Sequence, residues 1–76
     1  MSVVQLRRVD PTHNMARFYV MAVQPTLFGE WEFVREFGRI GSPGRVMRAT
    51  FGTLDEAASA LTKLWQQKLR RGYVRT

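Results

Sequence analysis

Cysteine is absent from this sequence of 76 residues, and histidine occurs once, as His13. Without cysteine the chain has no disulfide framework, no thiol nucleophile and no thiolate zinc site. With a single histidine, a histidine-based metal cluster or a Ser-His-Asp triad is hard to assemble. His13 also falls in a turn with Asp10, Pro11 and Asn14, which favours a solvated position. We therefore expect no metal, no cofactor and no catalytic residues.

Acidic residues are scarce as well, with six against twelve lysines and arginines, so the net charge is +6 at pH 7. Only Lys63 and Lys68 are lysines, and the other basic residues are arginines. The arginine side chain presents a planar fork of donors that matches phosphate and carboxylate groups. A small basic domain attracts polyanions, of which nucleic acid is the most abundant. The alternative is that the charges only keep a small protein in solution.

Long hydrophobic runs are missing too. The longest uninterrupted one, Phe18–Val23, is far short of the ~20 residues that a membrane span needs. No charged segment followed by an apolar stretch opens the chain, so we expect no secretory signal. These absences favour a protein of a reducing compartment, most simply the cytoplasm, with neither a membrane partner nor a small-molecule substrate.

Between residues 3 and 51 the hydrophobic residues recur with a period of two, which predicts four strands. They cover residues 3–9, 17–24, 31–40 and 45–51, with turns at 10–14, 25–29 and 41–44 that are rich in Pro, Gly, Asp and Asn. Because these connections are short, neighbouring strands should run antiparallel and form a meander.

The period changes to 3.6 over residues 54–69, which predicts an amphipathic helix with Leu61 and Trp65 buried against the sheet. Thr53 and Glu56 have the spacing of a capping box, and Gly72 is a favourable residue just beyond a helix end. Residues 73–76 would form a tail or a short edge strand. The expected fold is α+β: one domain over residues 1–76, with an antiparallel sheet of about four strands and one C-terminal helix packed on one face.

The third predicted strand and its flanks resemble the WGR domain, a family named after a Trp-Gly-Arg tripeptide. The resemblance rests on an ordered set of residues that spans essentially the whole chain: Trp31, Arg35, Phe37, Gly38, Arg39, Ile40, Gly41, Gly44, Phe51, Ala57, Ala58, Lys68, Gly72 and Tyr73. The sequence departs from the family at one position of the tripeptide, where Phe37 stands in place of the tryptophan.

WGR domains occur in DNA-damage-activated poly(ADP-ribose) polymerases, in some bacterial proteins and as small stand-alone chains, and we expect the bacterial stand-alone type here. In the polymerases the motif tryptophan packs on the sugar at a broken DNA end, and the motif arginine joins contacts between domains. The resemblance therefore implies such roles for Phe37 and Arg39. It implies neither ADP-ribosyl transfer nor a nicotinamide cofactor, because the chain has no room for a catalytic domain. Phenylalanine keeps the apolar packing of tryptophan but lacks its N–H donor.

The first functional hypothesis is a nucleic-acid-binding module that prefers DNA to RNA and contacts the backbone and strand ends or nicks. Its candidate residues are Arg35, Phe37, Gly38, Arg39, Arg45, Arg48, Lys68, Arg70 and Arg71. The last three also suit the negative end of the helix dipole, which is a simpler reason for their presence.

Several of these candidates have two readings. Arg35 should be exposed, because a charge is rarely buried without a partner, or else should bridge to Glu30 or Glu56. Arg45 and Arg48 differ in parity, so at most one of them shares a sheet face with Arg35. Phe37 is either a core residue or a surface contact that a bulge at the following glycine turns outward.

The second hypothesis is a protein-interaction module that docks on an acidic partner or self-associates through an edge strand. Catalysis is disfavoured, because the sequence offers no nucleophile–base pair. The glycines Gly38, Gly41 and Gly44 join two predicted strands and do not open a helix, so they do not form a dinucleotide-binding fingerprint.

Overall fold

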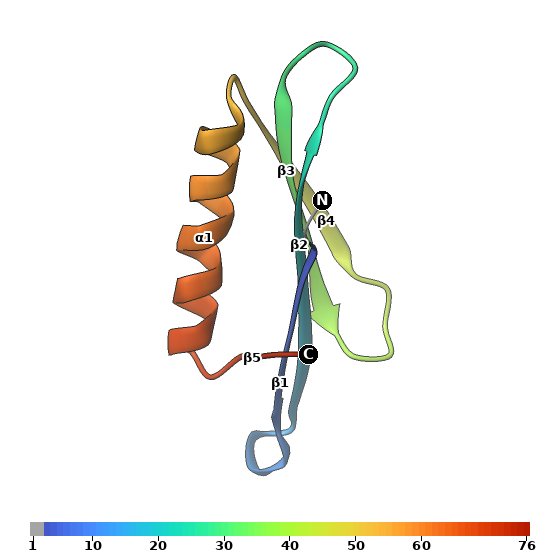
Figure 1. Ribbon diagram of the computed structural model, residues 1–76. Helices are drawn as coiled ribbons and strands as arrows, with labels where there is room; N and C mark the ends of the chain where they lie inside the picture. Colours follow the sequence, from blue (N-terminus) through green and yellow to red (C-terminus); the bar gives the residue numbers. More distant parts are fainter. Residues whose placement is uncertain (1–2) are drawn as a thin grey trace.

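The computed structural model describes residues 3–76 and shows a twisted sheet with one helix beside it (Figure 1). In chain order the elements are β1 (Val3–Asp10), a 3₁₀ turn η1 (Pro11–His13), β2 (Met15–Pro25), β3 (Trp31–Arg39), β4 (Arg45–Phe51), α1 (Leu54–Arg70) and β5 (Val74–Arg75). The α+β class and the C-terminal helix are thereby confirmed. The first two residues of the expected domain lie outside the described residues.

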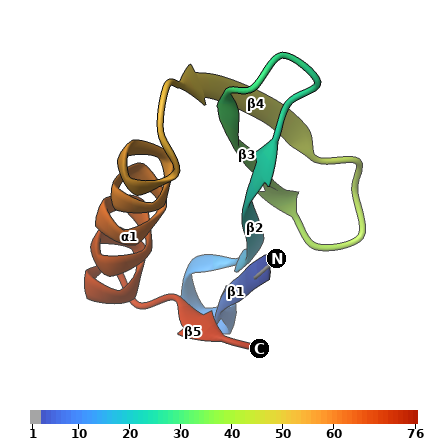
Figure 2. The ribbon, with the colours of Figure 1, turned by 45° about the horizontal axis from the view of Figure 1, so that its top comes forward.

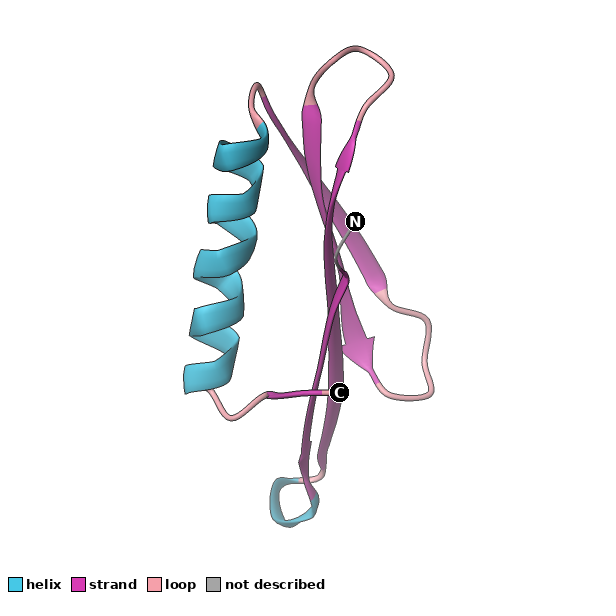
Figure 3. Ribbon diagram, viewed as in Figure 1, coloured by secondary structure: helices cyan, strands magenta, loops and turns pink. Residues whose placement is uncertain are grey.

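The sheet contains five strands in the order β4-β3-β2-β1-β5, and every neighbouring pair is antiparallel. The first four form the expected meander (Figure 3). The fifth strand arises because the chain leaves the helix and returns alongside β1, where Val74 lies opposite Arg7 and Arg75 opposite Leu6. Two residues are too few to produce a hydrophobic period, so the sequence indicates β5 only as a possible edge strand.

The helix begins and ends where the sequence predicts. Thr53 Oγ1 accepts a hydrogen bond from the Glu56 N–H at 3.2 Å, which confirms Thr53 as the helix cap. The Glu56 carboxylate reaches back to Thr53, as in a capping box, but accepts from the hydroxyl at 3.0 Å rather than from the backbone N–H. At the other end Gly72 has a φ of 92°, a conformation that glycine adopts without strain. The chain can therefore leave α1 sharply and turn back onto the sheet.

The core lies between α1 and one face of the sheet, and within the described residues no element covers the other face (Figure 2). Its buried residues are Val4, Leu6, Tyr19, Met21, Phe33 and Tyr73. From the helix, Leu61, Leu64 and Trp65 pack against this cluster, which confirms the predicted packing of Leu61 and Trp65 on the sheet, although both side chains are only partly buried. A single helix cannot enclose both flanks of its own apolar stripe, and part of each side chain therefore stays in solvent.

Candidate nucleic-acid interface

Three arginines stand side by side across three neighbouring strands. Arg8 of β1 lies opposite Arg17 of β2, and Arg17 lies opposite Arg39 of β3. Arg8 has the parity of the buried Leu6, so this arginine row projects from the sheet face that the helix covers. Opposite residues of antiparallel strands have Cβ atoms ~4.5–5.5 Å apart, and like charges so placed repel one another. Repulsion within the arginine row therefore destabilises the folded domain when no anion is bound, and a bound anion would relieve that repulsion.

A pair of stacked aromatic rings lies next to the arginine row. Phe37 is opposite Tyr19 across β3 and β2, with ring centroids 5.0 Å apart and ring planes at 8°. Pairing between these strands continues without interruption through Gly38, which is opposite Phe18, so no bulge turns Phe37 outward. Phe37 is half-buried and belongs partly to the core, while Tyr19 is buried.

Lys68 approaches these aromatic rings from α1. Its Nζ lies 4.7 Å from the ring centroid of Tyr19 and 5.5 Å from that of Tyr73. Burial, followed by the positive charges of Arg71, Arg35 and Arg17, lowers the pKa of Lys68 below its ordinary value. Positive neighbours lower the pKa of a lysine when no negative group nearby offsets their charge. The electrostatic potential around Lys68 is therefore positive and attracts anions.

These side chains surround a hollow of about 600 Å³. Its lining residues are Arg17, Phe18, Tyr19, Arg35, Phe37, Gly38, Arg39, Lys68 and Tyr73, and none of them carries a carboxylate. Arg35 donates a hydrogen bond to Tyr19 Oη at 3.2 Å, and Arg39 donates one to the Asn14 carbonyl at 3.2 Å. Because both acceptors are neutral, the guanidinium charges are held in place without being neutralised.

Two glycines mark a close approach between the end of β3 and the turn that follows it. A Cβ added at Gly38 would lie 3.3 Å from Gly44 Cα, and one added at Gly44 would lie 2.8 Å from both Phe18 and Glu36. The turn after β3 therefore folds down on the Phe18 ring. The glycine spacing that resembles the WGR motif thus has a packing cause in this chain, and that packing lies on the uncovered face, toward which a side chain at position 38 would point.

Most of the carboxylates lie away from the hollow. Glu30 directly precedes β3, and Asp55 and Glu56 are in the first turn of α1. The loop before β3 and the start of α1 both lie toward the end of the molecule opposite β5 (Figure 1). Glu32 has the parity of the uncovered sheet face and forms an ion pair with Arg48 at 2.8 Å. Among residues 3–76, Arg48 is the one arginine or lysine with a carboxylate oxygen within 4.0 Å.

The structure brings together five of the nine candidate residues, since Arg35, Phe37, Gly38, Arg39 and Lys68 all line the hollow. The exposure expected for Arg35 is wrong, because this side chain is half-buried against Tyr19, and neither Glu30 nor Glu56 bridges to it.

The other four candidates are divided among different places. Arg45 is opposite Phe37 and so projects from the same face, and Arg71 caps the C-terminal end of α1 beside Lys68. Arg70 lines a different cavity. Arg48 is opposite Val34 and pairs with Glu32, so it lies on the uncovered face, away from the hollow.

Five contributors were not predicted from the sequence: Arg8, Arg17, Phe18, Tyr19 and Tyr73. The proximity of the two arginines can be recognised only once the pairing register of the first two strands is known, because that register places Arg8 opposite Arg17. The tyrosines carry no such signal, because a tyrosine on an apolar strand, such as Tyr19, or just after an amphipathic helix, such as Tyr73, is more often a core residue.

Neither a membrane-crossing helix nor a metal cluster is found in residues 3–76. The helix α1 is too short and too polar to cross a bilayer. Over the same residues, no three histidine, aspartate or glutamate side chains gather in a way that could hold a metal ion.

Comparison with known proteins gives one family and one curated relative. The sequence model of the WGR domain matches residues 2–76. The uncharacterized protein y4dW of Sinorhizobium fredii is 43% identical over 68 residues, which amount to 90% of this chain and 33% of that protein. The chain thus spans about a third of the length of this relative. No solved structure matches the chain.

Proposed function

We propose that this chain, which belongs to the WGR domain family, is a non-catalytic module that binds nucleic acid in the hollow beside the arginine row. The observation that carries the proposal is the convergence of Arg17, Arg35, Arg39 and Lys68 on one hollow whose lining residues include no carboxylate. A sugar–phosphate backbone is the common polyanion that such a cluster neutralises, with release of counterions. Guanidinium groups add paired hydrogen bonds to phosphate oxygens.

The aromatic wall of the hollow favours a strand end or a nick over intact duplex. Phe37 lines the hollow and is only half-buried, so part of its ring is free for contact. A terminal sugar or base exposes an apolar face that stacking hides within a duplex, and such faces pack well on aromatic rings. In this proposal Phe37 receives the end, while Arg17, Arg39 and Lys68 hold the adjacent phosphates.

The proposed surface reads backbone and shape rather than base sequence. The helix packs its apolar stripe on the sheet, so it is not free to enter a major groove. Arg45 and Arg71 extend the basic surface beyond the hollow, whereas Arg48 faces the other way and is left out of it. DNA is proposed ahead of RNA because the family resemblance points to DNA ends.

Titration of fluorescent nucleic acids tests this function. The ligands are blunt, nicked, gapped and single-stranded DNA together with RNA, each at two salt concentrations. We expect Arg17→Ala and Arg39→Ala to weaken binding and to reduce the duplex salt slope by ~0.9 for each phosphate that the variant no longer neutralises. The control is Arg7→Ala, which removes the same charge from the uncovered sheet face, opposite Phe18. Equal decreases in affinity for Arg7→Ala and Arg17→Ala would show that binding is not localised to the hollow.

A further inference from the structure

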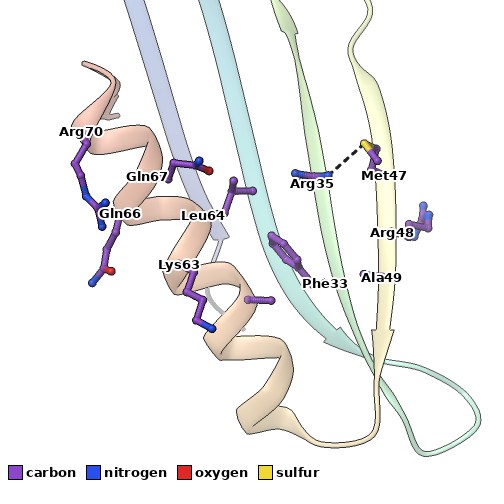
Figure 4. A pocket seen from close by; sticks show the side chains of 11 residues that line it. Phe33, Arg35, Met47, Arg48, Ala49, Lys63, Leu64, Gln66, Gln67 and Arg70 are labelled. Carbon is purple, nitrogen blue, oxygen red and sulfur yellow. Dashed lines mark hydrogen bonds between the residues drawn. The ribbon is translucent and has the colours of Figure 1, made fainter.

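A second cavity lies beside the hollow and shares Arg35 with it, while its other lining residues take no part in the proposed function. It is a groove of about 620 Å³ between α1 on one side and β3 and β4 on the other (Figure 4). Its apolar lining comes from Phe33, Met47, Ala49, Ala60 and Leu64. The groove is therefore able to receive apolar side chains of a ligand.

The helix side of the groove is polar and positively charged. Lys63, Gln66, Gln67 and Arg70 line it at i, i+3, i+4 and i+7 spacing, so they form one stripe along α1. Arg35 adds a third cation from β3, where its Nη2 donates a hydrogen bond to Met47 Sδ at 3.4 Å (Figure 4). Arg48 of β4 is a fourth cation of the lining, but its charge is paired with Glu32. None of the eleven lining residues carries a carboxylate.

The strand that borders the groove is the outer strand of the sheet. β4 pairs with β3 along its whole length, and no strand among the described residues pairs with its other side. All residues from Arg45 to Thr50 are exposed. Such an edge directs unpaired backbone N–H and C=O groups outward, where a further extended chain can pair with them.

We propose that the groove binds an extended acidic peptide segment of a partner protein, which adds to β4 as a sixth strand. Alternate side chains of an added strand point to the same face, so every second residue of the peptide would reach the groove. There, apolar side chains meet Met47 and Ala49, the groove residues of the neighbouring strand β4, while glutamate or aspartate side chains meet Lys63 and Arg70. The cationic stripe without any carboxylate selects an acidic peptide over a basic one.

Two other occupants fit the groove less well. A second copy paired along β4 would place arginines against arginines, because this strand carries Arg45 and Arg48 and no acidic residue. A nucleic acid would find no ring to stack on, since Phe33 is 7% exposed, and its backbone lacks the alternating donors and acceptors that a strand edge pairs with.

The test uses a fluorescein-labelled peptide, Glu-Thr-Leu-Thr-Glu-Thr-Leu, in which Glu and Leu alternate on one face. We expect saturable binding in fluorescence anisotropy and NMR shift changes concentrated in the amides of β4. The same peptide with lysine in place of glutamate should bind about tenfold more weakly or worse. A version with alternate backbone N-methyl groups, which cannot complete the strand pairing, should lose binding.

Protein variants locate the site. Lys63→Glu and Arg70→Glu, two exposed helix positions, should each weaken the glutamate peptide about tenfold. Arg7→Glu makes the same charge change on the uncovered face and should leave the affinity within about twofold. Arg17→Ala, which tests nucleic-acid binding, should leave peptide affinity unchanged. A failure of the peptide proposal can therefore be told apart from a failure of the nucleic-acid proposal. No saturable binding, equal binding of the lysine peptide, or shift changes outside β4 and α1 would each overturn the proposal.

Discussion

Arg35 donates a hydrogen bond to the Tyr19 hydroxyl, with 3.2 Å between Nη1 and Oη, and so ties the basic hollow to the hydrophobic core. Tyr19 is 4% exposed, and its ring also stacks on Phe37. The surface proposed to bind nucleic acid and the core that stabilises the fold therefore share a residue. A variant of this surface can therefore change stability as well as binding, and both quantities have to be measured on it.

The arginine row should make the free domain more stable as salt is added. Arg8, Arg17 and Arg39 repel one another across the strands, and ions screen that repulsion. Replacing Arg17 by Gln should raise the free energy of unfolding at low salt by ~0.2–1 kcal/mol and shrink the gain from added salt. Urea unfolding at two salt concentrations measures both effects. An Arg7→Gln control with the same response as Arg17→Gln would assign the effect to net charge instead.

Phe37→Ala should remove the preference for DNA ends and leave most of the salt-dependent affinity for intact duplex. The arginines supply that affinity, whereas the ring contributes only where an end is exposed. Phe37→Trp presents a larger face and should strengthen end binding by up to ~1–3 kcal/mol if the end stacks on it. Competition between blunt-ended and circular duplex gives the ratio, with thermal melts to confirm folding. A ratio unchanged in both variants would contradict end recognition.

Nucleic-acid affinity should fall as the pH rises from neutrality toward the ordinary lysine pKa of ~10.4. Burial and the charges of Arg71, Arg35 and Arg17 lower the Lys68 pKa, so this cation loses its proton early in that range. The stability of the free domain should change in the opposite direction. In the same window the unfolded chain binds more protons than the folded one, so the free energy of unfolding rises with pH.

Lys68→Arg provides the control for this pH effect, because arginine keeps its charge throughout. In that variant the affinity should stay flat over the part of the range below the tyrosine pKa of ~10. A fall of the same size in the wild type and in Lys68→Arg would assign the titration to another group. Anisotropy titrations and urea unfolding at matched pH values supply the two data sets.

Trp65→Ala should unfold most of the protein at 37 °C, whereas Trp65→Phe should be close to neutral. The truncation removes a large aromatic group from a small core, at a cost of ~3–5 kcal/mol when such a group is fully buried. Phenylalanine keeps much of that packing and also removes the indole N–H, which is buried without a hydrogen-bond partner. Thermal melts of the two variants check this order. A melt of Trp65→Ala near that of the wild type would show that the residue adds little to the core.

The fold was predictable from the sequence because each element carries a local signal. The capping pair Thr53 and Glu56 marks the start of the helix, and the strands are long enough for their period of two to be visible. The exception is β5, which has two residues and forms only because Gly72 turns the chain back toward β1.

The site was predictable only in part, because a surface depends on the pairing register between strands. Arg48 is close in sequence to Arg45, yet it projects from the other face and pairs with Glu32. Arg17 is distant in sequence from Arg39 but lies directly opposite it. The residue types alone indicated a surface that binds anions. Which residues lie beside each arginine depends on the lengths of the turns, and the sequence leaves those lengths uncertain by a residue or two.

The separation of charges along the molecule also has a kinetic consequence. Glu30, Asp55 and Glu56 lie toward one end and the arginine row lies near the other, where Asp10 offsets only part of its charge, so the domain is an electric dipole as well as a cation. The field of a polyanion exerts a torque on such a body and turns its basic end forward during diffusion, before any contact forms. Collisions would then occur mostly in the productive orientation, so the association rate constant would depend on salt even where the dissociation rate constant does not.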